Sequence, residues 1–146
     1  MDNRIWTVPA EVMKGRVGAT NDFRVPLSSE AMRVIELAHS EAACDGRLFP
    51  GGDGVIGDMT LSMHMKRRGL EARPHGFRTS LRVWLAEQTD ASREVAETVL
   101  AHTVGGKVER AYRRTDFLEH RRKYLEAWAQ FVSGATAEVA GIRNAA

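Results

Sequence analysis

The pattern of apolar and polar positions divides the chain into a short β-rich beginning and a long helical remainder. Residues 4–8 are rich in β-branched and aromatic side chains and stop at Pro9, which predicts a short strand. A glycine-containing, turn-like stretch follows, and residues 23–25 predict a returning strand before Pro26. The pattern therefore predicts a small N-terminal β-hairpin or sheet.

After the hairpin, apolar residues at helical spacing predict about five helices. Their predicted starting points are an N-cap at Ser28-Ser29-Glu30, then Asp58, Pro74, a cap at Thr89 or Asp90, and Asp116, with a short helix bearing Tyr112 after Gly105-Gly106. The predicted inward faces of three of them are Phe77, Leu81, Trp84 and Leu85; Val95, Ala96, Val99 and Leu100; and Phe117, Leu125, Trp128 and Val132. Tyr124 lies on the last of these faces and is predicted to be a core residue.

The predicted fold class is therefore α+β and mainly α, with the hairpin followed by about five helices. A chain of 146 residues is long enough for one ordinary domain with a core. We expect that domain over residues 1–133, followed by a flexible tail over residues 134–146. Cys44 is the single cysteine, so an intrachain disulfide and a thiolate metal cage are excluded. The sequence has no signal-peptide core and no apolar run of membrane-spanning length, which predicts a cytoplasmic protein without a membrane partner.

Charge permits an anionic partner without requiring one. The net charge is +2 and the sequence pI is about 9.0, but basic residues gather locally at residues 66–68, at Arg110 with Arg113 and Arg114, and at residues 121–123. Taken singly, each cluster is better explained as a solvated helix face.

Four further positions carry candidate chemistry, each with an ordinary alternative. His75 and Arg78 are three residues apart at the start of a predicted helix, so both lie on one face, where an anion is favoured. The alternative is a capping histidine beside a surface cation. His102 follows an apolar helix and is equally explained as a half-buried histidine that satisfies the end of that helix. Tyr112 lies among arginines that favour phosphate attack, although an amphipathic tyrosine at a helix interface is the commoner case.

In order and spacing, these residues resemble the catalytic domain of the tyrosine recombinase, or phage integrase, family. His75-Gly-Phe-Arg78 is similar to the family's His-x-x-Arg box, Leu100-Ala-His102 to its later histidine position, and Tyr112 to its nucleophile. Residues 6–28 resemble its β-hairpin, which places Lys14 at the catalytic lysine. The resemblance runs from about residue 4 to about residue 132, and it implies a catalytic-domain-like fold truncated at its N-terminus.

The resemblance implies site-specific DNA recombination or integration. Tyr112 would attack the scissile phosphate, giving a 3′-phosphotyrosyl link and a free 5′-hydroxyl, while Lys14 would protonate the leaving oxygen. His75 would act in acid–base steps, and Arg78 and His102 would hold the nonbridging oxygens. The partner would be double-stranded DNA, bound by a tetramer and contacted also by Arg110, Arg113, Arg114 and Lys107. Neither a cofactor nor a metal ion is implied.

The family also uses an earlier arginine, upstream of the hairpin, as the other half of the phosphate clamp. This chain begins at the hairpin, and Arg4 and Arg16 belong to or flank predicted strands. We therefore expect an incomplete site and little or no strand exchange by this chain alone. Two alternatives remain open: a noncatalytic DNA-binding or regulatory remnant of an integrase, and a small helical interaction module.

Overall fold

The N-terminal element is a two-stranded antiparallel sheet. The computed structural model describes residues 2–13, 21–41, 47–49, 55–102, 104–106 and 115–134. Strand β1 (Ile5–Val8) pairs with β2 (Phe23–Pro26), with Ile5 opposite Pro26 and Val8 opposite Phe23. Pro26 lies at the end of this sheet, where its missing N–H costs little. The predicted hairpin strands are confirmed, and β2 extends through the proline.

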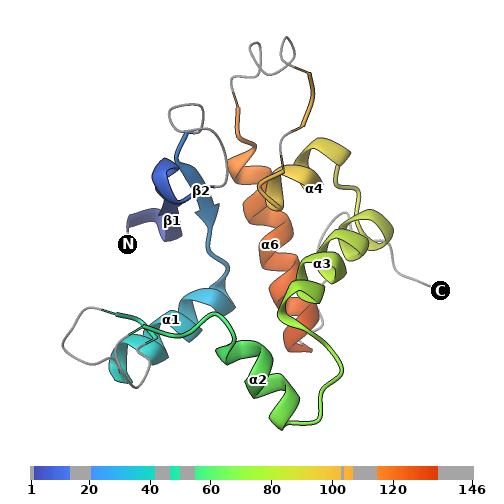
Figure 1. Ribbon diagram of the computed structural model, residues 1–146. Coiled ribbons are helices and arrows are strands. Elements are labelled where there is room, and N and C mark those ends of the chain that lie inside the picture. Colours follow the sequence, from blue (N-terminus) through green and yellow to red (C-terminus); the bar gives the residue numbers. More distant parts are fainter. Residues whose placement is uncertain are drawn as a thin grey trace.

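Five α-helices make up most of the described part of the chain. They are α1 (Ser29–Glu41), α2 (Thr60–Arg67), α3 (Pro74–Gln88), α4 (Arg93–Val99) and α6 (Leu118–Ser133). Short 3-10 turns lie at Asp2–Arg4 and Ala10–Val12. Helix α6 lies centrally, in contact with β2 and α1 on one side and with α4, itself packed on α3, on the other (Figure 1). The predicted α+β, mainly α class is confirmed.

The core lies where α3, α4 and α6 meet. Its buried members are Trp84, Leu85, Val95, Ala96, Tyr124 and Ala127. Trp84 and Trp128 place their ring centroids 5.3 Å apart, and Phe131 lies 5.6 Å from Trp128. Full burial of a large apolar side chain stabilises a fold by about 1.5–3 kcal/mol, so this small cluster fixes the three helices to one another. The prediction that Tyr124 is a core residue is confirmed.

Two residues predicted to face inward are exposed instead. Phe77, in the first turn of α3, is 59% exposed, and Val132, in the last turn of α6, is 57% exposed. On α3 the core reaches only Leu81, Trp84 and Leu85, so the first turn extends past its neighbours. Helical periodicity gives the direction of a side chain but not how far the neighbouring helices reach.

The predicted caps are partly right. Ser28 Oγ accepts a hydrogen bond from the Ala31 N–H at 3.2 Å, which confirms the predicted cap of α1. The predicted cap of α4 is wrong, because that helix is capped by Ser92, whose Oγ accepts from Val95 N–H at 3.3 Å. Thr89 serves the preceding helix: its hydroxyl donates to the Leu85 carbonyl at 2.6 Å.

Arg121 departs from the prediction for its basic cluster. We interpreted residues 121–123 as a solvated helix face, but the Arg121 side chain is only 1% exposed. Arg122 and Lys123 are more exposed than Arg121.

Within the part of the chain that the structure describes, no helix is long and apolar enough to cross a membrane.

Candidate functional site at the end of helix α4

Three of the predicted site residues lie in the described part of the chain: His75, Arg78 and His102. The other predicted residues, Lys14, Tyr112, Lys107, Arg110, Arg113 and Arg114, lie outside the described residues. The short helix predicted to bear Tyr112 and the tail at residues 135–146 also lie outside them. The candidate site is therefore built from two helices. His75 and Arg78 lie on α3, and His102 lies just after the end of α4.

Helix α4 ends in a Schellman motif, which fixes the position of His102. The Ala101 N–H donates to the Thr98 carbonyl at 3.0 Å, and the His102 N–H donates to the Glu97 carbonyl at 3.0 Å. Ala101 adopts the left-handed conformation that this motif needs, with φ 54°. An alanine is strained there, because its Cβ approaches the following carbonyl oxygen.

Arg78 reaches the same helix end from α3. Its Nη2 donates to the carbonyl oxygen of Leu100, the C-cap residue of α4. The last carbonyl groups of a helix carry partial negative charge, so a guanidinium is favoured there. The structure thus brings Arg78 to the end of α4, two residues before His102.

The carboxylate of Glu97 contacts the imidazole ring of His102. Its Nδ1 lies 2.6 Å from Glu97 Oε2, while the His102 side chain remains 47% exposed. Arg82 Nε donates to the other oxygen, Glu97 Oε1, at 2.8 Å. Hydrogen bonds from His102 and then from Arg82 hold the pKa of Glu97 below its ordinary value. His102 closes the end of α4 through its main chain, and its ring is exposed.

Sequence reasoning missed Glu97 and Arg82. One signal for Glu97 was available, because a Schellman motif brings the residue five positions before its last member into contact with that last member. Glu97 and His102 have this spacing. Arg82 lies one helical turn after Arg78 on α3, so the two arginines share a face.

His75 lies apart from these contacts, at the start of α3. It is exposed, directly follows the first helical residue, Pro74, and precedes Arg78 by about one turn. The N-cap residue of α3 is Arg73, which makes no side-chain cap, so the capping alternative for His75 is not what the structure has. The face at the start of α3 presents His75 and Arg78 to solvent.

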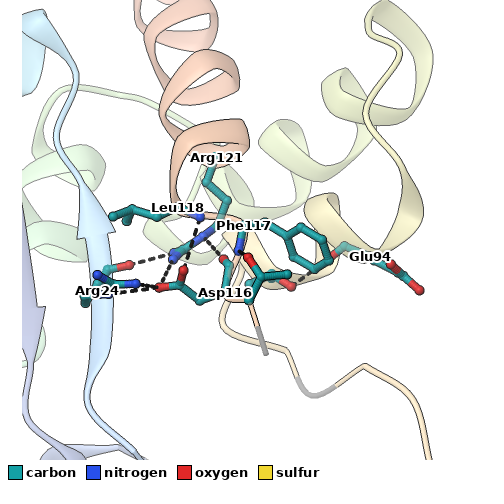
Figure 2. Close-up of polar contacts among 8 residues, drawn as sticks. Arg24, Glu94, Asp116, Phe117, Leu118 and Arg121 are labelled. Atoms are coloured by element: carbon teal, nitrogen blue, oxygen red, sulfur yellow. Dashed lines mark hydrogen bonds and ion pairs between the residues drawn. The ribbon is translucent and has the colours of Figure 1, made fainter. Parts of the chain in front are cut away.

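A second arginine–carboxylate network lies at the start of α6, with the buried side chain of Arg121 at its centre. Arg121 donates from Nε to the Asp116 carbonyl at 2.8 Å, from Nη1 to the Arg24 carbonyl at 2.7 Å, and from Nη2 to Asp116 Oδ2 at 3.1 Å (Figure 2). Arg24 adds an ion pair to Asp116 Oδ2 at 2.8 Å. Desolvation lowers the pKa of Arg121, and the attraction of Asp116 opposes that shift.

Metal binding has no support in this part of the chain. Among the residues described, no group of three or more histidine, cysteine, aspartate or glutamate side chains is placed to hold a metal ion. The groups that converge at the end of α4 are an arginine and a histidine. Both bind oxyanions by donating hydrogen bonds, so the arrangement suits a phosphate oxygen.

The chain is similar to three curated proteins named integrase. It is 32% identical to prophage integrase IntA of Escherichia coli K12 over 135 residues, 89% of this chain and 32% of that protein. It is 28% identical to the integrase of Shigella phage Sf6 and to prophage integrase IntS of Escherichia coli K12, over 90% of this chain and 34% of each. The chain thus spans about one third of the length of these relatives.

The other comparisons gave no match. No family model matches the chain, and no solved structure matches it.

Proposed function

We propose that this chain carries the catalytic part of an integrase that breaks and rejoins DNA through a 3′-phosphotyrosyl intermediate. The observation that supports this most is the meeting of Arg78 and the His102 segment at the end of α4, although they come from different helices. An exposed arginine and an exposed histidine near one helix end are residue types that suit the nonbridging oxygens of a phosphodiester. Similarity to three proteins named integrase supports DNA as the partner.

Tyr112 is the proposed nucleophile, and the contrast with Tyr124 supports it. The chain has two tyrosines. Burial, and then the hydrogen bond to Asp90 Oδ1 at 2.8 Å, raises the pKa of Tyr124 to about 12. A nucleophilic oxygen needs the opposite effect, so Tyr124 is kept protonated and structural. Tyr112 has arginines at positions 110, 113 and 114, which favour a phenolate and a bound phosphate.

The remaining roles follow the family pattern. Lys14 protonates the leaving 5′-oxygen, His75 exchanges protons near neutral pH, and Arg78 and His102 stabilise charge on the phosphorane-like transition state. Arg110, Arg113, Arg114 and Lys107 contact the DNA backbone, and assembly on DNA is tetrameric. Residues 1–146 do not include the family's upstream arginine. Removing one such donor costs about 3 kcal/mol of transition-state stabilisation, so we expect little or no complete strand exchange from these residues alone.

The test is covalent capture on a nicked suicide DNA substrate, which accumulates even slow cleavage because the cut strand diffuses away. We expect a protein–oligonucleotide adduct by mass spectrometry, with the oligonucleotide on Tyr112. Tyr112→Phe removes the adduct and Tyr124→Phe, the matched control, retains it. Adduct formation by Tyr112→Phe contradicts the proposal.

A noncatalytic DNA-binding fragment is the second candidate, favoured by the exposed basic end of α2, where Lys66, Arg67 and Arg68 all face solvent. It predicts no adduct but DNA retention that weakens steeply with salt, because bound phosphates release counterions. An absence of both adduct and retention leaves only the helical interaction module.

A further inference from the structure

Glu97 connects the two helices that build the candidate site. Its Oε2 contacts His102 Nδ1 at 2.6 Å, and its Oε1 accepts from Arg82 Nε at 2.8 Å. The Glu97 side chain is 21% exposed, less than either of its partners. One carboxylate therefore holds a ring on one side and a guanidinium on the other.

The hydrogen-bond partners settle which ring nitrogen of His102 carries hydrogen. The pKa of Glu97 lies below its ordinary value, so near neutral pH its oxygens accept hydrogen bonds and donate none. Nδ1 must then be the donor, and Nε2 is the nitrogen left for a ligand. In the neutral ring Nε2 accepts a proton, whereas in the protonated ring it donates to an oxyanion.

Helix α3 fixes both sides of this arrangement. Arg78 binds the Leu100 carbonyl, and Arg82, one turn later on the same face, binds Glu97. The end of α4 is thereby held at its backbone and at its side chain by the helix that carries the predicted phosphate-binding arginine. Helix α3 therefore holds both the residue that contacts the His102 ring and the backbone two residues before His102.

We propose that Glu97 is a positioning residue that holds His102 by Nδ1, so that Nε2 of the protonated ring donates to a nonbridging phosphate oxygen of DNA, and that Arg82 orients Glu97. This inference rests on the proposed function for its ligand but not for its geometry. The competing explanation is a purely structural bridge between α3 and α4, in which the tautomer and orientation of His102 have no consequence.

Nitrogen-15 NMR of the histidine rings separates these explanations without any DNA. In the full 146-residue chain above neutral pH, we expect His102 to be the Nδ1–H tautomer. Glu97→Met shifts it toward the Nε2–H form that unconstrained histidine side chains favour. Glu87→Met, an equal loss of charge on exposed α3 surface, leaves the tautomer unchanged. A wild-type Nε2–H ring, or a Glu97→Met ring like that of wild type, overturns the inference.

A second comparison separates positioning from helix bridging. Arg82→Met removes the contact between α3 and α4 but keeps the Glu97–His102 pair. A structural bridge predicts that Arg82→Met and Glu97→Met affect His102 alike. Positioning predicts the larger tautomer change in Glu97→Met, and thermal unfolding confirms that each variant is folded.

Covalent capture on nicked DNA then tests the consequence for the reaction. We expect Glu97→Met to slow adduct formation roughly 10–100-fold, the scale on which groups that orient a functional histidine act. In a His102→Ala background, Glu97→Met adds no further loss; an undiminished further loss shows that Glu97 acts elsewhere. A wild-type chain that forms no adduct contradicts the proposed catalysis. The NMR measurement of the His102 tautomer still tests the role of Glu97 in that case.

Discussion

Two arginine–carboxylate networks hold two helix ends in this molecule, and they differ in what they leave exposed. At the start of α6, Arg121 is 1% exposed and all three guanidinium nitrogens donate within the chain. At the end of α4, Glu97 holds His102, whose side chain is 47% exposed. The side chain at the centre of the first network is buried, whereas the second network ends in a ring that faces solvent.

The exposure of the polar side chains distinguishes a structural network from a candidate site. Arg121 joins β2 to α6 across a long stretch of sequence, and each of its three guanidinium nitrogens donates to a group within the chain (Figure 2). His102 contacts Glu97 of the helix that it directly follows, through one of its two ring nitrogens. An oxyanion is attracted where donors remain open, so the end of α4 is the better candidate.

The largest expected effect is the loss of stability when the network around Arg121 is broken. Arg121→Met removes three hydrogen bonds and leaves the carbonyls of Arg24 and Asp116 without that partner. Breaking a buried ionic network from one side costs about 3–5 kcal/mol, and we expect that loss in the free energy of unfolding measured with urea. Arg122→Met, whose pair with the exposed Glu119 is at the surface, should change stability by at most about 1 kcal/mol. Equal effects of the two variants contradict the comparison.

The next largest effect is a change in stability that comes from the backbone conformation of Ala101, at the end of α4. Helix α2 ends in the same Schellman motif as α4, but with Gly69 at φ 70° where α4 has Ala101 at φ 54°. We expect Ala101→Gly to raise the free energy of unfolding by about 0.5–1 kcal/mol, because the left-handed strain is relieved. Gly69→Ala should lower it by a similar amount, since the backbone rather than a clash opposes the new Cβ. A destabilising Ala101→Gly contradicts the assignment of strain.

The smallest expected effect is a change in the pKa of Glu97. The pKa of Glu97 is lowered, so its bridge stabilises the fold above the unfolded-state pKa of about 4.5 and is lost as pH falls through the lower folded-state value. His102→Ala removes the largest cause and should raise the pKa of Glu97 toward its ordinary value. Arg82→Met should raise it less. Carbon-13 NMR of the carboxyl group measures both, and an unchanged pKa in His102→Ala contradicts the contact.

Local patterns predicted much of this fold, because strands, helices and their inner faces depend on neighbouring residues. The hairpin, the cap at Ser28 and the core position of Tyr124 are confirmed. The burial of Arg121 was missed, since its partners include Arg24, which is distant in sequence. A run of basic residues has the same local sequence pattern whether one of its side chains is buried or all of them are solvated.

In the candidate site, the residue types were predicted but their supports were not. Arg78 and His102 were selected by a family pattern, and the structure brings their segments together. Glu97 was overlooked because its five-residue spacing to His102 has meaning only where α4 ends in a Schellman motif. Its significance comes from the turn that ends α4, which returns His102 onto it. The predictions for Lys14 and Tyr112 stay predictions.

The most direct test of the contrast is the salt dependence of DNA binding by two matched arginine variants. Each phosphate contact contributes about 0.9 to the slope of log affinity against log salt concentration. Arg78→Gln should lower the magnitude of that slope by about one contact, whereas Arg24→Gln, whose guanidinium pairs with Asp116, should leave it unchanged. An unchanged slope in Arg78→Gln, or an equal loss in both variants, contradicts a phosphate site at the end of α4.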